Sequence, residues 1–436
     1  MEIQRLTQIS PGRLRQILQR SRAEVFDADR AAHVRAIVED VRERGDAAIT
    51  EYTQRHDGVT LSSDRLQVDR QEISRAHEAV DGALRTALAA SIDRTRRYNE
   101  WLRPPALQLE ELEDGLITGV KFAPVESVGV YIPSGKGAFP STFITLVTPA
   151  IVAGVTDIAV VVPPRKDGSV DPALLVAADL LGVSQLFRCN GVAGIAGLAF
   201  GTATLPRVEL LGGPGNPYVT AAQIAVQAHG VRLLSFLGPT ESLILADETA
   251  DPDRLALDLL NEAEHGADSA AILLVTSASL AGEVRERLPR YLAQLPAGRR
   301  EFAEAAMSRY GGVFVVDTVE QAVAFANLYA PEHLQIATRD PFATLLQIRN
   351  AGEVLLGQDT PFSAGNYAIG VPAALPTSGF ARVASGVTVL SYLKATSIAH
   401  LDPAGLDRVR PVIERLGQYE DFPAHVLAVR ARREPT

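Results

Sequence analysis

Short apolar runs alternate with helical segments between Val128 and about residue 385, and this alternation constrains the fold more than any other feature. The runs are VGVYI, IAVVVPP, QLFRC, VELLGG and VRLLSF, followed by SLILAD, AAILLV, FVV and LQIA. Because helical stretches separate the runs, consecutive strands are joined by crossovers, as in parallel β-α-β units. The alternation restarts after Gly238. The sequence therefore predicts an α/β protein with two parallel-sheet units.

The segments on either side of this region have helical character. Residues 1 to about 100 carry Arg, Asp and Glu at helical spacing, and Gly45 and Gly58 punctuate the helices. From about Gly386 the chain returns to an amphipathic helical pattern. The chain has 436 residues. Since domains usually contain roughly 100 to 150 residues, we expect about two to four structural units.

Charge and cysteine content exclude several classes of function. The net charge is −10 and no basic stripe stands out, so nucleic acid is not an expected partner. Cys189 is the single cysteine, which fits a reducing cytoplasm. The charged N-terminus does not resemble a signal peptide. The charge-free stretch 137–156 contains Pro140 and Pro149, so we expect a buried helix there rather than a membrane span.

Two glycine-rich loops each follow a predicted strand and precede a predicted helix. PSGKGAFPS spans Pro133 to Ser141, and GGPGN spans Gly212 to Asn216. Backbone amides and a helix N-terminus at such a turn can hold an anion, which indicates a phosphate or a dinucleotide. The spacing fits neither a P-loop nor the G-x-G-x-x-G pattern, so the glycines could instead serve only to permit tight turns.

Glu262 and His265 lie at the end of a predicted helix in the segment DPDRLALDLLNEAEHGADS. Pro252 can begin this helix and Gly266 can end it, so the two side chains project from one face of its last turn. A carboxylate and an imidazole at this spacing suit a zinc-type ion, although the pattern is common by chance.

Glu332 and His333 stand together after Pro331 and just before a predicted strand, in LYAPEHLQIA. Loops at strand ends often display catalytic groups. Histidine titrates near neutral pH and burial can raise the pKa of a glutamate, so the two could transfer protons. A surface dipeptide is the alternative on spacing alone. His425, close to Glu420, is uninformative by itself.

Seven motifs taken together resemble the histidinol dehydrogenase family in order and spacing. They are GVYIPSGKGAFPS, GGPGNPYV, GPTESLILAD, EAEHGADS, APEHL, SAGNYAIGVPAALPTSGFAR and EDFPAH, and they span nearly the whole chain. The resemblance implies NAD-dependent oxidation of L-histidinol to L-histidine, in histidine biosynthesis, through an aldehyde held on the enzyme. It also implies one zinc ion per chain and a cytoplasmic homodimer in which the C-terminal domain completes the partner's site.

The resemblance also implies a division of the chain into two incomplete Rossmann-like domains with small helical domains at both ends. We expect an N-terminal helical segment at 1–25 and a C-terminal helical dimerisation domain at 386–436. The first Rossmann-like domain would comprise 26–129, with a helical N-terminal part, and 240–385. The second would comprise 130–239.

Carried over position by position, Glu332 and His333 correspond to the family's catalytic pair. His333 would remove the hydroxyl proton, and Glu332 would activate the water that hydrates the aldehyde. The implied dinucleotide contacts are Tyr131, Asn216 and Ala193. The implied metal ligands are Glu262, His265, Asn366 and His425. The implied substrate contacts are Thr240, Glu262, His265, His333, Asn366, Ala373, Glu420 and His425.

Four of these positions depart from the family's pattern. Glu262 replaces a Gln ligand and Asn366 replaces an Asp ligand, so the formal charge of the ligand set is unchanged and we expect a retained metal site. Asn is a poorer donor than Asp. Ala373 stands in place of a substrate-contacting His, and Ala193 in place of a Gln that touches the dinucleotide. A paralogue that oxidises another polar alcohol, or a non-catalytic binding protein, is therefore an alternative.

Overall fold

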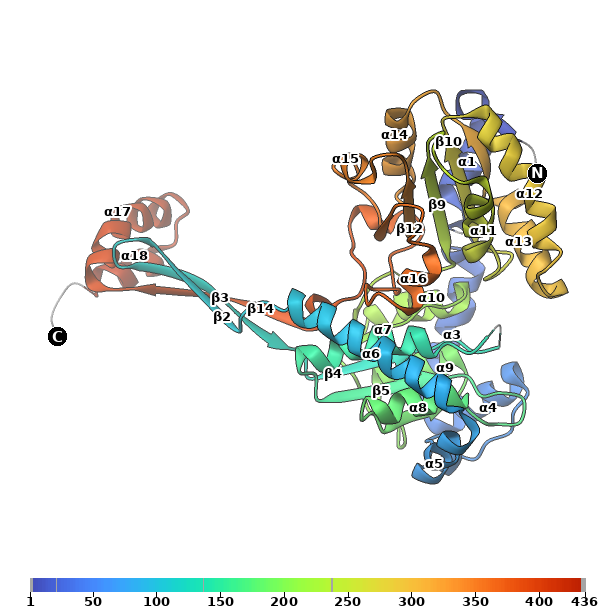
Figure 1. Cartoon of the computed structure of the whole chain (residues 1–436). Coiled ribbons are helices and arrows are strands. Elements are labelled where there is room, and N and C mark those ends of the chain that lie inside the picture. Colours follow the sequence, from blue (N-terminus) through green and yellow to red (C-terminus); the bar gives the residue numbers. More distant parts are fainter. Residues whose placement is uncertain (1–2, 21, 136, 237, 433–436) are drawn as a thin grey trace. The chain divides into compact units, whose positions relative to one another are not determined.

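The computed structural model describes residues 3–20, 22–135, 137–236 and 238–432. The chain divides into two compact units (Figure 1). Unit 1 comprises Met1–Leu102 and Val125–Tyr392, and unit 2 comprises Arg103–Pro124 and Leu393–Thr436. Among the described residues, no helix is both long enough and apolar enough to span a membrane.

Unit 1 contains a six-stranded, fully parallel sheet with the order β1-β11-β10-β9-β12-β13. Its strands are β1 (Ile3–Arg5), β9 (Glu241–Ala246), β10 (Ala270–Val275), β11 (Gly312–Val315), β12 (His333–Ala337) and β13 (Glu353–Leu356). Its helices are α1 (Pro11–Gln19), α11 (Pro252–Ala263), α12 (Ala278–Leu292), α13 (Ala297–Arg309), α14 (Val319–Tyr329), α15 (Pro341–Leu345) and α16 (Phe362–Tyr367).

Helices cover both faces of this sheet because its central strands are apolar on both sides, as parallel sheets require. On one face, side chains of α11, α12 and α13 pack around Ile244 and Leu273. On the other face, α1 and α14 pack around Leu243 and Leu274.

Unit 1 also contains a five-stranded parallel sheet with the order β6-β5-β4-β7-β8. Its strands are β4 (Ser127–Tyr131), β5 (Asp157–Val162), β6 (Gln185–Arg188), β7 (Leu210–Gly212) and β8 (Arg232–Leu233). The remaining helices of unit 1 are α2 (Arg22–Val25), α3 (Ala28–Arg44), α4 (Asp46–Asp57), α5 (Arg70–Ala79), α6 (Gly82–Leu102), α7 (Pro140–Ala153), α8 (Pro172–Leu180), α9 (Gly191–Phe200) and α10 (Pro217–Gln227). Side chains of α3, α4, α9 and α10 share one core with this sheet.

The predicted α/β class is confirmed, and every apolar run named above overlaps a strand. The helix predicted within 137–156 is α7, which is largely buried. Two strands of the parallel sheets were not predicted. β1 lies in the N-terminal segment that we expected to be helical, and β13 was not recognised.

The two sheets share a topology. Leaving β1 aside, both orders read third, second, first, fourth and fifth strand along the chain. In such sheets the connections turn to opposite sides between the first and the fourth strand, and ligands usually bind at the carboxyl ends of those two strands. The switch points are β4/β7 and β9/β12.

The part of unit 2 that the structure describes, up to residue 432, forms a three-stranded antiparallel sheet and two helices. Its elements are β2 (Leu107–Glu113), β3 (Leu116–Pro124), β14 (Leu393–Leu401), α17 (Pro403–Tyr419) and α18 (Pro423–Arg430). The prediction of helix from about Gly386 is wrong for 393–401, because this segment pairs with β3 along its whole length and tertiary pairing overrides a weak local pattern.

This pairing also explains where the chain divides. Residues 103–124 belong with 393–436 and not with the Rossmann-like part of the chain. The expected boundaries at 129 and 386 therefore differ from those of unit 2. The finer division of unit 1 at 130–239 and 240–385 stays a prediction. The described residues also form four short 3₁₀ helices: η1 (Leu6–Gln8), η2 (Ser63–Arg65), η3 (Phe380–Arg382) and η4 (Val389–Tyr392).

Candidate active site

The amino edge of the six-stranded sheet carries a cluster of buried ionisable side chains. Glu241, His333 and Glu353 are the first residues of β9, β12 and β13, and Glu332 immediately precedes β12. The strands are parallel and in register, with His333 opposite Glu353 and opposite Ser242, so these starting residues lie side by side. All four ionisable side chains are buried.

His333 lies between two carboxylates. Its Nδ1 is 2.5 Å from Oε1 of Glu353, and its Nε2 is 3.7 Å from Oε1 of Glu332. Burial alone would lower the pKa of His333, but the negative charges of Glu332, Glu262 and Glu353 outweigh it and raise the pKa to about 10. The cluster therefore stabilises the protonated imidazole.

Glu332 is held from the opposite side. The Glu241 N–H donates to its Oε2 at 2.8 Å. Burial raises the pKa of Glu332 well above its ordinary value, so this carboxyl group can hold or release a proton in a range useful for catalysis. Behind it, the buried guanidinium of Arg20 pairs with Glu241 at 3.2 Å and stacks on the ring of Tyr329.

Glu262, His265 and Asn366 come together at the end of α11. The Asn366 amide donates to Oε1 of Glu262 at 2.7 Å, and Nε2 of His265 lies 3.3 Å from Oε2. Burial alone would raise the pKa of Glu262, but the charges of His333 and His265 and the amide hydrogen bonds hold it below its usual value. Glu262 is therefore a buried carboxylate that lies between the Asn366 amide and the His265 ring.

These three side chains fit a zinc-type ion in chemistry, because they offer one carboxylate, one imidazole and one amide. As a ligand, Asn366 would present Oδ1 rather than the Nδ2 that now faces Glu262. Within the described ranges, no three His, Cys, Asp or Glu side chains are grouped so that they could hold a metal ion. The fourth expected ligand, His425, lies in α18 of unit 2.

The other expected substrate contacts have different settings. Thr240 directly precedes β9 and is partly buried, as is Ala373. Glu420 follows α17 in unit 2 and is exposed. The structure thus brings Glu262, His265 and Asn366 together in unit 1, and leaves Glu420 and His425 in the other unit.

Both glycine-rich loops lie at the carboxyl edge of the five-stranded sheet, at its switch point. One follows β4 and the other follows β7, and these strands are neighbours. Lys136 of the first loop lies outside the described residues. A Cβ at Gly213, where φ is +152°, would lie 2.0 Å from the carbonyl oxygen of Tyr131. The second loop therefore requires glycine in order to approach β4.

The three expected dinucleotide contacts differ in exposure. Asn216 is exposed and caps α10, where its side chain accepts from two backbone N–H groups. Tyr131 is buried, and its ring lies against Gly191 at the start of α9. Ala193 is fully buried in the core. The fit to a dinucleotide thus rests on the exposed helix N-terminus at Asn216 and on the glycine backbone of the two loops.

Helix α16 and its flanking residues connect these features. Gly365 lies against Glu353, and Asn366 donates a hydrogen bond to Glu262. The helix packs on both α11 and α7. A Cβ at Gly137, in the first glycine loop, would lie 3.4 Å from the guanidinium of Arg299, which donates to the Glu264 carbonyl just after α11.

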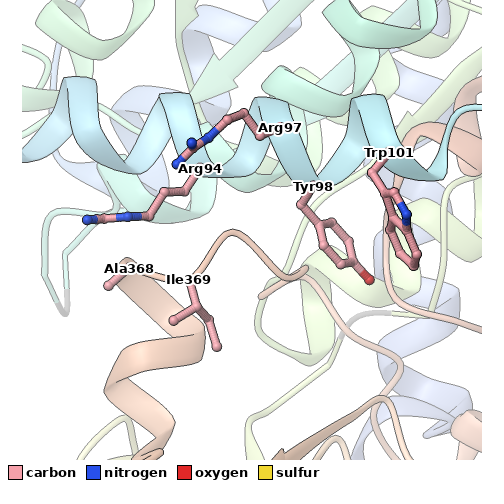
Figure 2. A pocket seen from close by; sticks show the side chains of 6 residues that line it. All are labelled: Arg94, Arg97, Tyr98, Trp101, Ala368 and Ile369. Carbon is pink, nitrogen blue, oxygen red and sulfur yellow. The ribbon is translucent and has the colours of Figure 1, made fainter.

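A cleft of about 710 Å³ opens between α6 and the residues that follow α16. Figure 2 shows Tyr98 and Trp101 projecting from the same side of α6. Burial raises the pKa of the Tyr98 hydroxyl, and the negative charge of Glu353 raises it further. The lining residues of the cleft are Arg94, Arg97, Tyr98, Trp101, Ala368 and Ile369.

Sequence reasoning missed Glu353, Glu241 and Arg20. EVLL is a short apolar run that could have indicated β13, but nothing in the sequence shows that its first residue faces His333. That contact depends on strand register. Arg20 reaches the site from a helix end distant in sequence, for which we find no sequence signal.

Comparison with known proteins identifies the family. The pattern described as histidinol dehydrogenase matches residues 20–433. A histidinol dehydrogenase of Synechocystis is 42% identical over 99% of this chain and 98% of its own length, and a histidinol dehydrogenase homolog of Colwellia psychrerythraea is 39% identical over 100% and 97%. The crystal structure of histidinol dehydrogenase from Elizabethkingia anophelis superposes with a TM-score of 0.90 at 32% identity, covering 99% of this chain and 97% of that one. Sequence and fold agree over almost the full length, and the chain is a member of the histidinol dehydrogenase family.

Proposed function

We propose that this oxidoreductase converts L-histidinol to L-histidine in two NAD-dependent oxidations, with the aldehyde retained between them. The observation that supports this most is the buried pair Glu332 and His333 beside Glu262, His265 and Asn366. It joins two proton-transfer groups to a polar set that suits an amino alcohol.

In the first oxidation, Nε2 of His333 accepts the proton of the substrate hydroxyl as the carbinol hydride departs. NAD, when bound, supplies the acceptor for that hydride and leaves as NADH. The carboxylates around His333 favour this step because they stabilise the imidazolium that forms.

In the second oxidation, Glu332 takes a proton from water as the water oxygen adds to the aldehyde carbon. Loss of a second hydride from the hydrate, for which a second NAD would be the acceptor, then gives the carboxylic acid. Burial of Glu332 excludes other water and raises its proton affinity, as a general base requires.

A zinc-type ion would be held by Glu262, His265 and Asn366, and by His425 supplied by unit 2 of the partner subunit. The ion would orient the substrate by binding the imidazole and amino nitrogens of L-histidinol. The retained ligand charge supports this proposal. Asn216 and the loops after β4 and β7 would hold the dinucleotide.

We further propose a cytoplasmic homodimer in which unit 2 completes the partner's site. Exposed apolar side chains on unit 2 support an interface there: Val412, Leu416, Tyr419, Phe422 and Leu427. The lone cysteine, Cys189, is buried and free, which supports a reducing compartment.

A paralogue activity on another polar alcohol is the second candidate. Ala373 cannot form the hydrogen bond that the family's His provides, and one relative of similar identity is called a homolog rather than a histidinol dehydrogenase. A lost hydrogen bond to a charged group costs about 1.5 to 3 kcal/mol, or roughly tenfold to more than a hundredfold in kcat/KM.

The deciding experiment measures NADH production on L-histidinol beside a panel of amino alcohols and of sulfonated or phosphorylated diols. We expect turnover of L-histidinol with a high KM, improved kcat/KM in Ala373→His, and inhibition by a chelator. Inert L-histidinol together with turnover of a smaller polar alcohol would overturn the histidinol assignment and favour the paralogue. No turnover of any alcohol would favour a binding protein.

A further inference from the structure

Glu353 is a buried carboxylate beside His333 to which the family resemblance assigns no role. It begins β13 directly opposite His333 in the register of β12, and its backbone N–H donates to the Glu332 carbonyl at 3.0 Å. Strand pairing thus fixes the two side chains on neighbouring positions of one sheet edge. Oε1 of Glu353 is 2.5 Å from Nδ1 of His333.

The surroundings of Glu353 leave its carboxylate few alternatives. Its Oε2 is buried and has no hydrogen-bond partner among the described residues. A Cβ at Gly365 would lie 3.0 Å from both carboxylate oxygens, so α16 covers the group as closely as a glycine allows. The ring of Phe362 packs edge-on against the imidazole. These contacts hold the carboxylate and the ring in one arrangement.

The arrangement selects a tautomer of His333. In the neutral ring only one nitrogen carries a proton, and a carboxylate only accepts hydrogen bonds, so Nδ1 facing Glu353 keeps the proton and Nε2 is left as the acceptor. Nε2 faces the side of Glu332, 3.7 Å away. The same logic applies to catalytic triads, in which replacement of the orienting carboxylate by an amide costs about 10⁴ in kcat.

We propose that Glu353 is a positioning residue that keeps the proton on Nδ1 of His333 and thereby presents Nε2 to the substrate hydroxyl. The proposal rests on the proposed function for its reaction, while the Nδ1 contact itself does not depend on turnover. Glu353→Gln keeps the size of the side chain but offers both a donor and an acceptor to the ring, so it removes the selection.

The first arm of the test is kinetic. We expect Glu353→Gln to lower kcat at least about 100-fold while both KM values change less than about threefold, and Glu353→Asp to retain more activity than the amide. Gly365→Ala, which displaces the carboxylate without altering it, should reproduce part of the loss. Asp258→Asn is the matched control. Asp258 is as buried as Glu353, and it accepts a hydrogen bond at 2.7 Å from Gln335, which lies on β12 as His333 does.

The second arm needs no turnover. In ¹⁵N-labelled protein, the Nδ1 proton bonded to Glu353 should give a strongly downfield proton signal, assigned by its loss in His333→Asn. The signal should persist in Asp258→Asn and disappear or move upfield in Glu353→Gln. An unchanged signal in Glu353→Gln, or wild-type kcat in that variant, would overturn the positioning role. Inactive wild type with the expected signal change would overturn the proposed function and leave the positioning intact.

Discussion

The two parallel sheets of unit 1 share one strand order but carry their candidate functional groups at opposite edges. In the five-stranded sheet, glycine-rich backbone follows the carboxyl ends of β4 and β7. In the six-stranded sheet, buried side chains at the amino ends of β12 and β13 form the ionisable cluster. Topology therefore indicates where loops can hold a ligand, whereas a site built from strand starts depends on which side chains the register brings together.

The largest expected effect separates the two edges by kinetic role. His333→Asn should lower kcat by about 10² to 10⁴, the usual contribution of a general base. Asn216→Ala, at the other edge, should mainly raise the KM for NAD, because it removes a cap from the N-terminus of α10. Steady-state kinetics with each substrate varied would measure both changes. If His333→Asn mainly raised the KM for NAD and Asn216→Ala mainly lowered kcat, the two edges would not have these separate roles.

The pair itself should divide the two oxidations. Glu332→Gln should still oxidise the alcohol but slow aldehyde oxidation by on the order of 10² or more. His333→Asn should affect alcohol oxidation more. Single-turnover NADH formation on the alcohol and on the aldehyde distinguishes these outcomes. Small, equal effects on both steps in both variants would show that the pair is not catalytic.

An intermediate effect concerns the carboxyl edge alone. Gly213→Ala places a Cβ 2.0 Å from the carbonyl of Tyr131, whereas Gly135→Ala, also at positive φ, meets nothing within 4 Å. Backbone strain alone should cost Gly135→Ala about 1 to 3 kcal/mol, and the clash should cost Gly213→Ala about 1 to 3 kcal/mol more. Urea unfolding measures both. Equal losses would mean that the loop relaxes freely, and that its approach to β4 is not a constraint.

A further contrast concerns the pH dependence of stability around the two sheets. The pKa of His333 is raised to about 10 from an ordinary value of 6.5. This stabilisation is complete below pH 6.5 and is lost as the pH rises toward 10. Near the five-stranded sheet, burial alone would raise the pKa of Glu72, but the hydrogen bonds and charge of Arg188 hold it below 4.5. That stabilisation is present above pH 4.5 and is lost as the pH falls.

Urea midpoints from about pH 3 to about pH 10, with chelator present, test this contrast. His333→Asn should flatten the alkaline decline, and Glu72→Gln should flatten the acid decline that the Arg188 pair causes. Identical profiles for both variants would contradict it.

The sequence predicts features that have a local pattern, and it misses those that depend on pairing between strands. The interior strands of both sheets are continuous apolar runs, so VGVYI and AAILLV were recognised as strands. β1 is too short to show a pattern, and β2 is exposed along its length. For the site, adjacency and resemblance identified Glu332 and His333 together. They could not identify Glu353, because its place opposite His333 is a consequence of pairing between strands and not of any local spacing.

The discontinuous make-up of unit 2 has a consequence for synthesis of the chain. β3 pairs with β2 on one side and with β14 on the other, and the whole of 125–392 lies between β3 and β14. During translation the β2–β3 hairpin is synthesised early. One edge of β3 then has no hydrogen-bonding partner until β14 is made. An isolated hairpin is only marginally stable, and an open edge is a template for aggregation. A chain shortened before Leu393 should therefore leave one edge of β3 permanently unpaired and depend on chaperones to stay dispersed.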